Sequence, residues 1–282
     1  MIPVGGVWVT LHRVGSDQAA PLDSVRADSR GRYEFNFRRT GDQQAIYFVS
    51  AAYGGVAYFT PPLVHSLVRG QEAEIAVFDT TSGHVPISVR GHHIIVSSVD
   101  ANAVRSITEV FELANDSSVT KVAGTGTEGA VWTTSFPDRA SGFQVTQGDV
   151  PADAVQFSGG RALIYAPLAP GLKQIAISYT IPASAFPLRM PVLRDTQILE
   201  VLVEEEKGTV GGAKLKEVAP VALERRSFRR FLADDVPANE VSTIDLPAVT
   251  AARDIDPRYM VALTVAIGAA MISALAYALR RR

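Results

Sequence analysis

The sequence predicts a mainly β protein: tandem antiparallel β-sandwich modules followed by one C-terminal transmembrane α-helix. Three observations lead to this prediction. Apolar and polar residues alternate along many short segments, which is the period of a half-buried strand. The 22 glycines and 16 prolines interrupt these segments, as expected for short strands joined by turns. Finally, residues 260–279 contain no charged side chain.

Alternation places the first expected strands at 7–11, 33–37 and 75–77. Clusters of turn-forming residues separate them, at the short spacing of an antiparallel sandwich. Further strands are expected at residues 94–96, 110–113, 162–165, 175–179, 198–203, 228–232 and 241–246. Residues 218–231 come nearest to a helical pattern, and Pro220 would confine any helix to the part that follows it.

Three segments near the N-terminus form a recognisable set: Pro3–Leu11, Asp28–Phe35 and Tyr47–Ala51. Together they resemble the carboxypeptidase regulatory-like domain, a transthyretin-like β-sandwich. The resemblance covers about the first 80 residues and implies a non-enzymatic module that is appended to envelope proteins for packing or ligand contact.

The resemblance also implies local structure. Gly31 is expected to supply the positive φ of a tight turn, and Tyr33 and Phe35 are expected to fill the core from a central strand. The family has one more strand before the stretch at Pro3, so a first strand and an export signal are expected upstream of Met1. Without that strand, a sheet edge would be exposed along Val7–Leu11 or its neighbour.

The expected domain plan follows from these patterns. It comprises a carboxypeptidase regulatory-like sandwich at 1–82, a second sandwich at 83–197, a small β unit or the closing strands of the second at 198–248, a juxtamembrane linker at 249–258, a transmembrane helix at 259–279 and a cytoplasmic tail at 280–282.

Twenty uncharged residues in a helix span roughly 30 Å, about the thickness of the hydrocarbon core. The segment before them balances two arginines with two aspartates, whereas Arg280, Arg281 and Arg282 follow them. The positive-inside bias therefore predicts a cytoplasmic C-terminus and extracytoplasmic N-terminal domains, periplasmic or extracellular, at the cell membrane. The alternative is the reverse orientation, with a cytosolic head on a tail anchor.

A ridge of small residues is expected on one face of this helix. Alanine recurs there every fourth residue, at Ala262, Ala266, Ala270, Ala274 and Ala278. Such stripes allow helices to approach closely in lipid, so this face is predicted to pack against a copy of itself or a membrane protein partner. The alternative is that the stripe reflects alanine-rich composition and faces lipid.

Composition excludes several kinds of chemistry. The chain has no cysteine, hence no disulfide, thiol nucleophile or thiolate metal site. Its formal charge of −2 gives no reason to expect nucleic acid as a partner. Neither Gly-x-Ser-x-Gly nor His-Glu-x-x-His occurs. We therefore expect no catalytic, cofactor-binding or metal-binding residues.

Four motifs have two interpretations each. Residues 124–129 match a dinucleotide fingerprint, but strand-like residues follow, which favours a hairpin loop. His92 and His93, with His84 nearby, would suggest a metal site, but neighbours on a strand point to opposite faces, which favours ordinary strand residues.

The other two motifs are charged. The acidic run 204–206 is expected to be a solvated turn rather than a calcium site. The arginines at 225, 226, 229 and 230 are expected to form a solvated face, the alternative being contact with anionic envelope polymers or lipid headgroups.

The predicted function is that of a single-pass membrane-anchored envelope protein whose β-sandwich domains act as a non-catalytic binding or structural module. Expected partners are the lipid bilayer, a membrane protein or second copy, and an envelope protein or carbohydrate. One alternative is an accessory subunit of a membrane transport, sensing or redox complex. The other is an envelope hydrolase whose carboxylate or histidine cluster only the fold would assemble.

Overall fold

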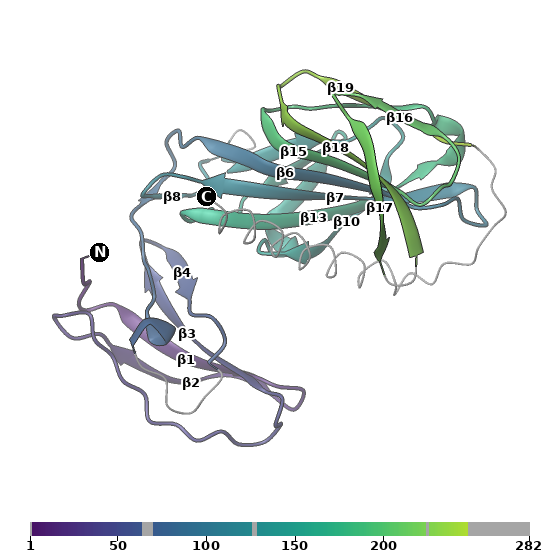
Figure 1. Ribbon diagram of the computed structural model, residues 1–282. Coiled ribbons are helices and arrows are strands. Elements are labelled where there is room, and N and C mark those ends of the chain that lie inside the picture. Colours follow the sequence, from purple (N-terminus) through teal and green to yellow (C-terminus); the bar gives the residue numbers. More distant parts are fainter. Residues whose placement is uncertain (1, 64–69, 126–128, 224–225, 248–282) are drawn as a thin grey trace. The chain divides into compact units, whose positions relative to one another are not determined.

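The computed structural model describes residues 2–63, 70–125, 129–223 and 226–247 (Figure 1). These residues are mainly β, which confirms the predicted class. Among them, none belongs to a helix with the length and apolarity needed to cross a membrane. The expected linker, transmembrane helix with its alanine ridge, and terminal arginines lie outside the described residues.

The described residues fall into two compact units. The first contains those up to Thr81 together with Ser118–Thr120, and the second contains Ser82–Ser117 and those from Lys121 onward. The two-residue strands β5 (Thr80–Thr81) and β8 (Thr120–Lys121) pair with each other.

The first unit is built on a four-stranded antiparallel sheet with the order β2-β1-β3-β4. Period-two alternation sends Val9 and Leu11 to the core, where they meet Tyr47 and Val49. The strands are β1 (Trp8–Val14), β2 (Ala19–Arg26), β3 (Ile46–Tyr53) and β4 (Val56–Phe59). β1 has a partner on both sides and is therefore not an edge; the edge strands of this sheet are β2 and β4. The strand expected upstream of Met1 stays a prediction.

Two strands expected in this unit do not form. Residues 33–37 and 75–77 belong to no strand, although Tyr33, Phe35 and Phe37 do pack in alternation against the core. Alternation indicates which side chains reach the core. A strand also needs backbone hydrogen bonds to a neighbouring strand. The positive φ expected at Gly31 is confirmed, at +72°.

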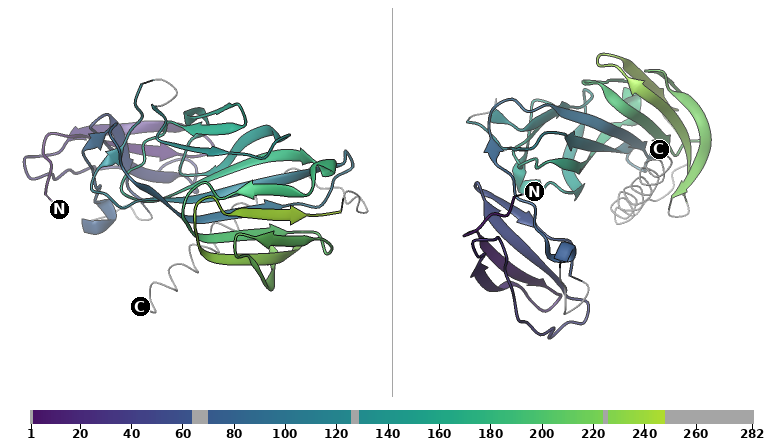
Figure 2. Two further views of the ribbon diagram at one scale, coloured as in Figure 1. Left: turned by 90° about the horizontal axis from the view of Figure 1, so that it is seen from above. Right: turned by 60° about the vertical axis from the view of Figure 1, so that its left-hand side comes forward.

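The second unit is built on a seven-stranded sheet with the order β10-β13-β7-β6-β15-β18-β17. The right-hand view of Figure 2 shows this sheet to be curved, with the green strands bending away from the blue ones. Its strands are β6 (Ile87–Val96), β7 (Val104–Asn115), β10 (Ser141–Gly148), β13 (Gly171–Pro182), β15 (Thr196–Val203), β17 (Lys216–Leu223) and β18 (Arg226–Val236).

This sheet is not purely antiparallel, which corrects the prediction. β15 runs parallel to β6. A parallel pair needs a long crossover connection, and here about a hundred residues carrying several other strands separate the two in sequence. The described residues of the stretch 218–231, nearest to a helical pattern, lie in strands β17 and β18 and not in a helix.

Two three-stranded sheets, with the orders β11-β12-β9 and β14-β19-β16, complete the unit. Their residues share one large core with one face of the seven-stranded sheet. The strands are β9 (Trp132–Ser135), β11 (Val155–Ser158), β12 (Arg161–Ile164), β14 (Leu188–Pro191), β16 (Thr209–Gly212) and β19 (Val241–Asp245). Short 3₁₀ helices are η1 (Gly70–Ala73), η3 (Ala152–Ala154) and η4 (Ala183–Ala185).

Residues after 198 are thus divided between sheets: β15, β17 and β18 lie in the seven-stranded sheet, and β16 and β19 pair beside β14. A second, smaller apolar cluster occupies the other face of the seven-stranded sheet. It contains Ile95, Val110, Ala176, Leu202, Leu223 and Phe228.

Candidate functional site

A buried polar network lies on the core-facing side of the seven-stranded sheet. His92 Nε2 on β6 is 2.6 Å from Glu109 Oε2 on β7. The hydroxyl of Tyr179 on β13 donates to Glu109 Oε1 at 2.6 Å. Glu109 and Tyr179 are only 2% and 1% exposed. The Glu109 carboxylate is therefore hydrogen-bonded to His92 and Tyr179 and is almost fully shielded from solvent.

Strand register brings these three residues together. A β-bulge between Val89 and Gly91 sets the pairing of β6 with β7, so that His92 lies opposite Phe111. Glu109 is two residues further along the same face of β7, at the diagonal position that long side chains can reach. The His92 ring stacks on Phe111 with centroids 4.3 Å apart.

Burial controls the ionisation of Tyr179. It raises the pKa of Tyr179 well above its usual value, and the adjacent Glu109 charge adds to that shift. Tyr179 therefore stays protonated at neutral pH and acts as a hydrogen-bond donor.

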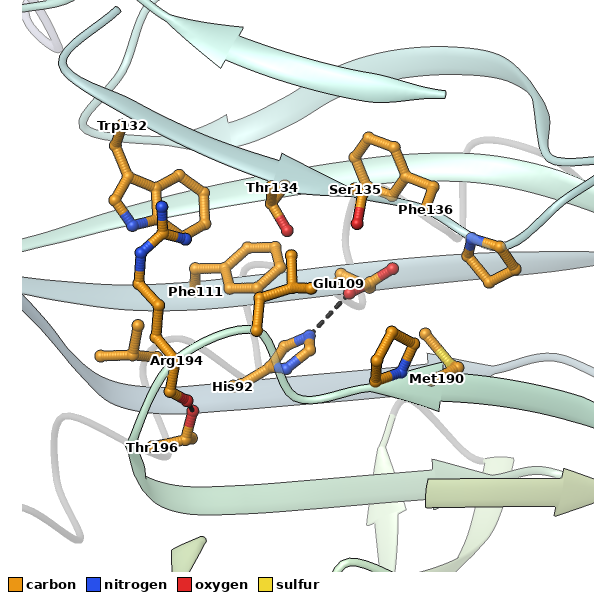
Figure 3. A pocket seen from close by; sticks show the side chains of 14 residues that line it. His92, Glu109, Phe111, Trp132, Thr134, Ser135, Phe136, Met190, Arg194 and Thr196 are labelled. Atoms are coloured by element: carbon orange, nitrogen blue, oxygen red, sulfur yellow. Dashed lines mark hydrogen bonds and ion pairs between the residues drawn. The ribbon is translucent and has the colours of Figure 1, made fainter. Parts of the chain in front are cut away.

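A cavity of about 50 Å³ adjoins the network (Figure 3). His92, Glu109 and Phe111 line one side of it, and Thr134 and Met190 are among the residues that line the rest. One water occupies roughly 10–15 Å³ on this measure. The cavity thus has room for a few waters and not for a sugar ring or a peptide.

Trp132 and Arg194 lie at the edge of this cavity. Figure 3 shows the Arg194 guanidinium group beside the Trp132 ring, and its carbon lies 5.3 Å from the ring centroid. Arg194 Nη1 also donates to the Thr133 carbonyl at 2.8 Å. Burial lowers the pKa of Arg194. Trp132 is 4% exposed, and its Nε1 has no hydrogen-bond partner among the described residues.

The same two residues also line a larger, open cleft of about 740 Å³ in the second unit. We call it the basic cleft, because it contains several cationic side chains and, among the described residues, no carboxylate. It is lined by His84, Val85, Pro86, Ile87, Lys121, Ala130, Val131, Trp132, Thr133, Arg161, Leu163 and Arg194.

The opposite face of the seven-stranded sheet carries a second buried network. His93 Nδ1 is 2.6 Å from Glu200 Oε2, and Arg230 donates to the other oxygen of Glu200. Burial by itself would raise the pKa of Glu200, but the hydrogen bonds and charges of its two partners outweigh burial and lower it. His93 Nε2 is buried with no hydrogen-bond partner among the described residues.

The acidic run 204–206 is the predicted solvated turn only at Glu206, which is exposed; Glu204 and Glu205 are not solvated in this way. Glu205 is 6% exposed, and the fully buried Arg105 donates to it at 2.9 Å. Glu204 accepts hydrogen bonds from Arg226 and Ser98. A charge that leaves water requires a partner, and the fold supplies cations from strands distant in sequence.

The arginine cluster differs from expectation in the same way. Arg226 pairs with Glu204, Arg229 with Glu217 and Arg230 with Glu200. These three arginines are therefore neutralised within the protein. Arg225 lies outside the described residues.

The histidine pair behaves as the sequence predicts in one respect: its members point to opposite faces and meet different partners. His84 lines the basic cleft. Strand β9, not a helix, follows the glycine-rich run; residues 126–128 of that run are outside the described part. Among the described residues, no group of three or more His, Cys, Asp or Glu could hold a metal ion.

Sequence reasoning missed Trp132 and Arg194 as site residues. The two are 62 positions apart, and neither belongs to a motif. The available signal was that Trp132 is one of only two tryptophans in the chain.

Comparison with known proteins does not assign the chain to a family: no family model matches it, and no curated protein sequence matches it. The resemblance of the first unit to the carboxypeptidase regulatory-like domain therefore stays a prediction, and the function has to be inferred from the residues and their geometry.

Proposed function

We propose that this chain is a single-pass membrane-anchored envelope protein whose extracytoplasmic β-sandwich domains act as a non-catalytic binding module, with the basic cleft as its ligand site. The size of the cleft is the observation that carries the proposal. Ligand pockets typically measure roughly 300–1,000 Å³, and the cleft, at about 740 Å³, lies within this range.

The His92 network supports binding over hydrolysis. A catalytic histidine and carboxylate must come within hydrogen-bonding distance of a reacting group. Glu109 is 2% exposed, and the adjoining cavity of about 50 Å³ does not admit a substrate. The network is better suited to joining three neighbouring strands, β6, β7 and β13.

The sequence supports the anchor and its orientation. Residues 260–279 carry no charge and three arginines follow them, so the positive-inside bias favours an extracytoplasmic head. A protease added to intact spheroplasts is expected to digest residues 1–250 and leave a small anchored stub. Full protection of the head would overturn the proposed localisation.

Tryptophan fluorescence tests the binding function directly. The chain has two tryptophans, and Trp8 belongs to the first unit. The Trp8→Phe variant of the full chain in mild detergent therefore reports from Trp132 alone. We expect a saturable change in its emission with at least one member of a panel of neutral oligosaccharides, acidic oligosaccharides, peptides and nucleotides.

The control is the Trp132→Phe variant, which retains Trp8 and is expected to show no saturable change. Its thermal unfolding is compared with that of the parent to establish that it folds. If no member of the panel changes Trp132 emission saturably, the binding function is wrong. Release of a cleaved product from any panel member would favour the hydrolase instead.

A further inference from the structure

Among the described residues that line the basic cleft, positively charged side chains are not matched by negatively charged ones. Lys121, Arg161 and Arg194 line it, and no aspartate or glutamate among the described residues does. Elsewhere in the same unit, Arg226, Arg229 and Arg230 each pair with a glutamate. Arg161 is exposed and forms no ion pair with any described residue, so its guanidinium group is available to a ligand.

Two donors at the cleft are held in place before any ligand arrives. Arg194 is fixed by the Thr133 carbonyl at 2.8 Å and by the Trp132 ring at 5.3 Å. Holding a guanidinium group in one orientation reduces the entropy lost on binding. Burial lowers its pKa, and a bound anion would offset that cost.

Trp132 supplies the second fixed donor. Buried polar groups are almost always hydrogen-bonded, yet its Nε1 has no partner among the described residues although the side chain is 4% exposed. An indole N–H can only donate; because this one is buried, a ligand oxygen would reach it only after a local shift of the cleft wall.

Lys121 adds a third position along the cleft. Its Nζ donates to the carbonyls of Ser82 and Gly83 at 2.6 and 2.8 Å. An ammonium group has three donors, so these two bonds orient the group and leave one donor for a ligand. Cations thus come from β8, β12 and the segment after β14.

We infer that the ligand of the basic cleft is an oligoanion: a molecule of several units whose carboxylate or phosphate oxygens pair with Arg161, Arg194 and Lys121. This inference rests on the proposed binding function. The cleft volume of about 740 Å³ suits an oligomer better than a single inorganic ion, since one ion would contact only part of it. Guanidinium groups recognise both kinds of oxyanion by paired hydrogen bonds.

The experiment uses the full chain with Trp8→Phe in mild detergent and titrates three probes of three units each: trigalacturonate, tripolyphosphate and neutral maltotriose. We expect at least one of the two anions to bind at least ten-fold more tightly than maltotriose. The tighter anion identifies carboxylate or phosphate as the preferred group. Raising the salt from 50 to 200 mM should weaken anion binding several-fold, because exposed charges are screened.

Arg161→Gln provides the decisive variant, since an exposed side chain is replaced and folding should be unaffected. It should weaken anion binding at least five-fold. Arg189→Gln is the matched control: Arg189 is an exposed arginine of the same unit that does not line the cleft, and its loss should change affinity less than two-fold. Equal weakening by both variants would overturn the inference.

Binding of maltotriose as tight as that of the anions would also overturn the oligoanion inference while leaving the binding function intact. The absence of saturable binding across the wider panel would instead reject the binding function itself.

Discussion

His92 and His93 are adjacent in sequence, yet each is hydrogen-bonded to a different buried glutamate, on opposite faces of the seven-stranded sheet. His92 Nε2 lies 2.6 Å from Glu109 and His93 Nδ1 lies 2.6 Å from Glu200. Because consecutive side chains of a strand point in opposite directions, one dipeptide contributes to two separate networks. Strand β6 is thus joined to β7 by a polar contact on one face of the sheet and to β15 by a polar contact on the other.

Tyr179→Phe tests the network on the core-facing side. The change removes the hydroxyl that donates to buried Glu109 at 2.6 Å. Hydrogen bonds to charged groups contribute about 1.5–3 kcal/mol, so the unfolding free energy of the second unit should fall by about that amount. Trp132 fluorescence in the Trp8→Phe background, followed through urea unfolding, measures it.

Tyr165→Phe is the control for that prediction. Tyr165 is half-buried in the same unit, and no described residue accepts a hydrogen bond from its hydroxyl. This variant should lie within about 0.5 kcal/mol of the parent. Equal destabilisation by the two changes would contradict a specific role for the Tyr179 hydroxyl.

Gly91→Ala tests the crowding on the other face. An added Cβ would lie 2.6 Å from His93 Nε2 and 2.8 Å from Glu112 Oε2, closer than real side chains approach. Both groups are buried, so making room should cost about 1–3 kcal/mol. A fall in the melting temperature of the second unit is the expected readout.

Gly211→Ala is the matched control, because a Cβ there meets nothing within 4 Å and Gly211 has no left-handed φ. Its melting temperature should stay close to that of the parent. If Gly91→Ala were equally harmless, the close approach of His93 and Glu112 to Gly91 would be wrong.

The sequence predicts the mainly β class well but underestimates the central strands. Only residues 110–113 of β7 were expected from the pattern, whereas β7 covers twelve residues. Arg105, Glu109 and Glu112 interrupt its hydropathy, yet all three are buried. A pattern of apolar residues cannot reveal a strand whose polar side chains are buried through partners supplied by other strands.

The site was less predictable than the fold, for a related reason. The partners of His92 and His93 are 17 and 107 residues away in sequence, and Arg194 is 62 residues from Trp132. The two histidines stand out because they are adjacent in sequence. Glu200 lies beside His93 because β15 pairs in parallel with β6, and this pairing depends on a long crossover. Such a pairing leaves no local signal.

Acid should destabilise the second unit through Glu200 and Glu204. Burial opposes the ionisation of both carboxyl groups. The partners of each nevertheless lower its pKa below the ordinary value of 4.5: His93 and Arg230 act on Glu200, and Arg226 and Ser98 act on Glu204. Because the folded values are depressed, this stabilisation is complete above about pH 4.5 and is lost as the pH falls through them.

Glu200→Gln separates this effect from general acid unfolding. At pH 7 the variant should be less stable than the parent, and the difference should shrink as the pH falls below 4.5, since the parent then loses the same charge. Urea unfolding between pH 3 and 7 measures the difference. Glu240→Gln changes an exposed carboxylate and should run parallel to the parent; a constant deficit for Glu200→Gln would contradict the linkage.

Arg105→Met tests the ion pair between Arg105 and Glu205. Arg105 is fully buried and donates to Ser97 O, Glu205 Oε1 and Pro247 O. Methionine retains much of the side-chain volume but removes the positive charge of Arg105 from beside buried Glu205. Breaking a buried pair from one side costs about 3–5 kcal/mol, and the melting temperature should fall accordingly.

The double variant Arg105→Met with Glu205→Gln discriminates this cause from lost packing. Neutralising Glu205 removes the buried charge that has lost its ion pair with Arg105, so the double variant should be more stable than Arg105→Met alone, although it still lacks the bonds to the two carbonyls. The coupling energy from the four urea unfolding curves of this cycle measures the pair. A double variant no more stable than Arg105→Met would mean that the buried charge of Glu205 is not what destabilises the single variant, and that Arg105 acts mainly through Ser97, Pro247 and its packing.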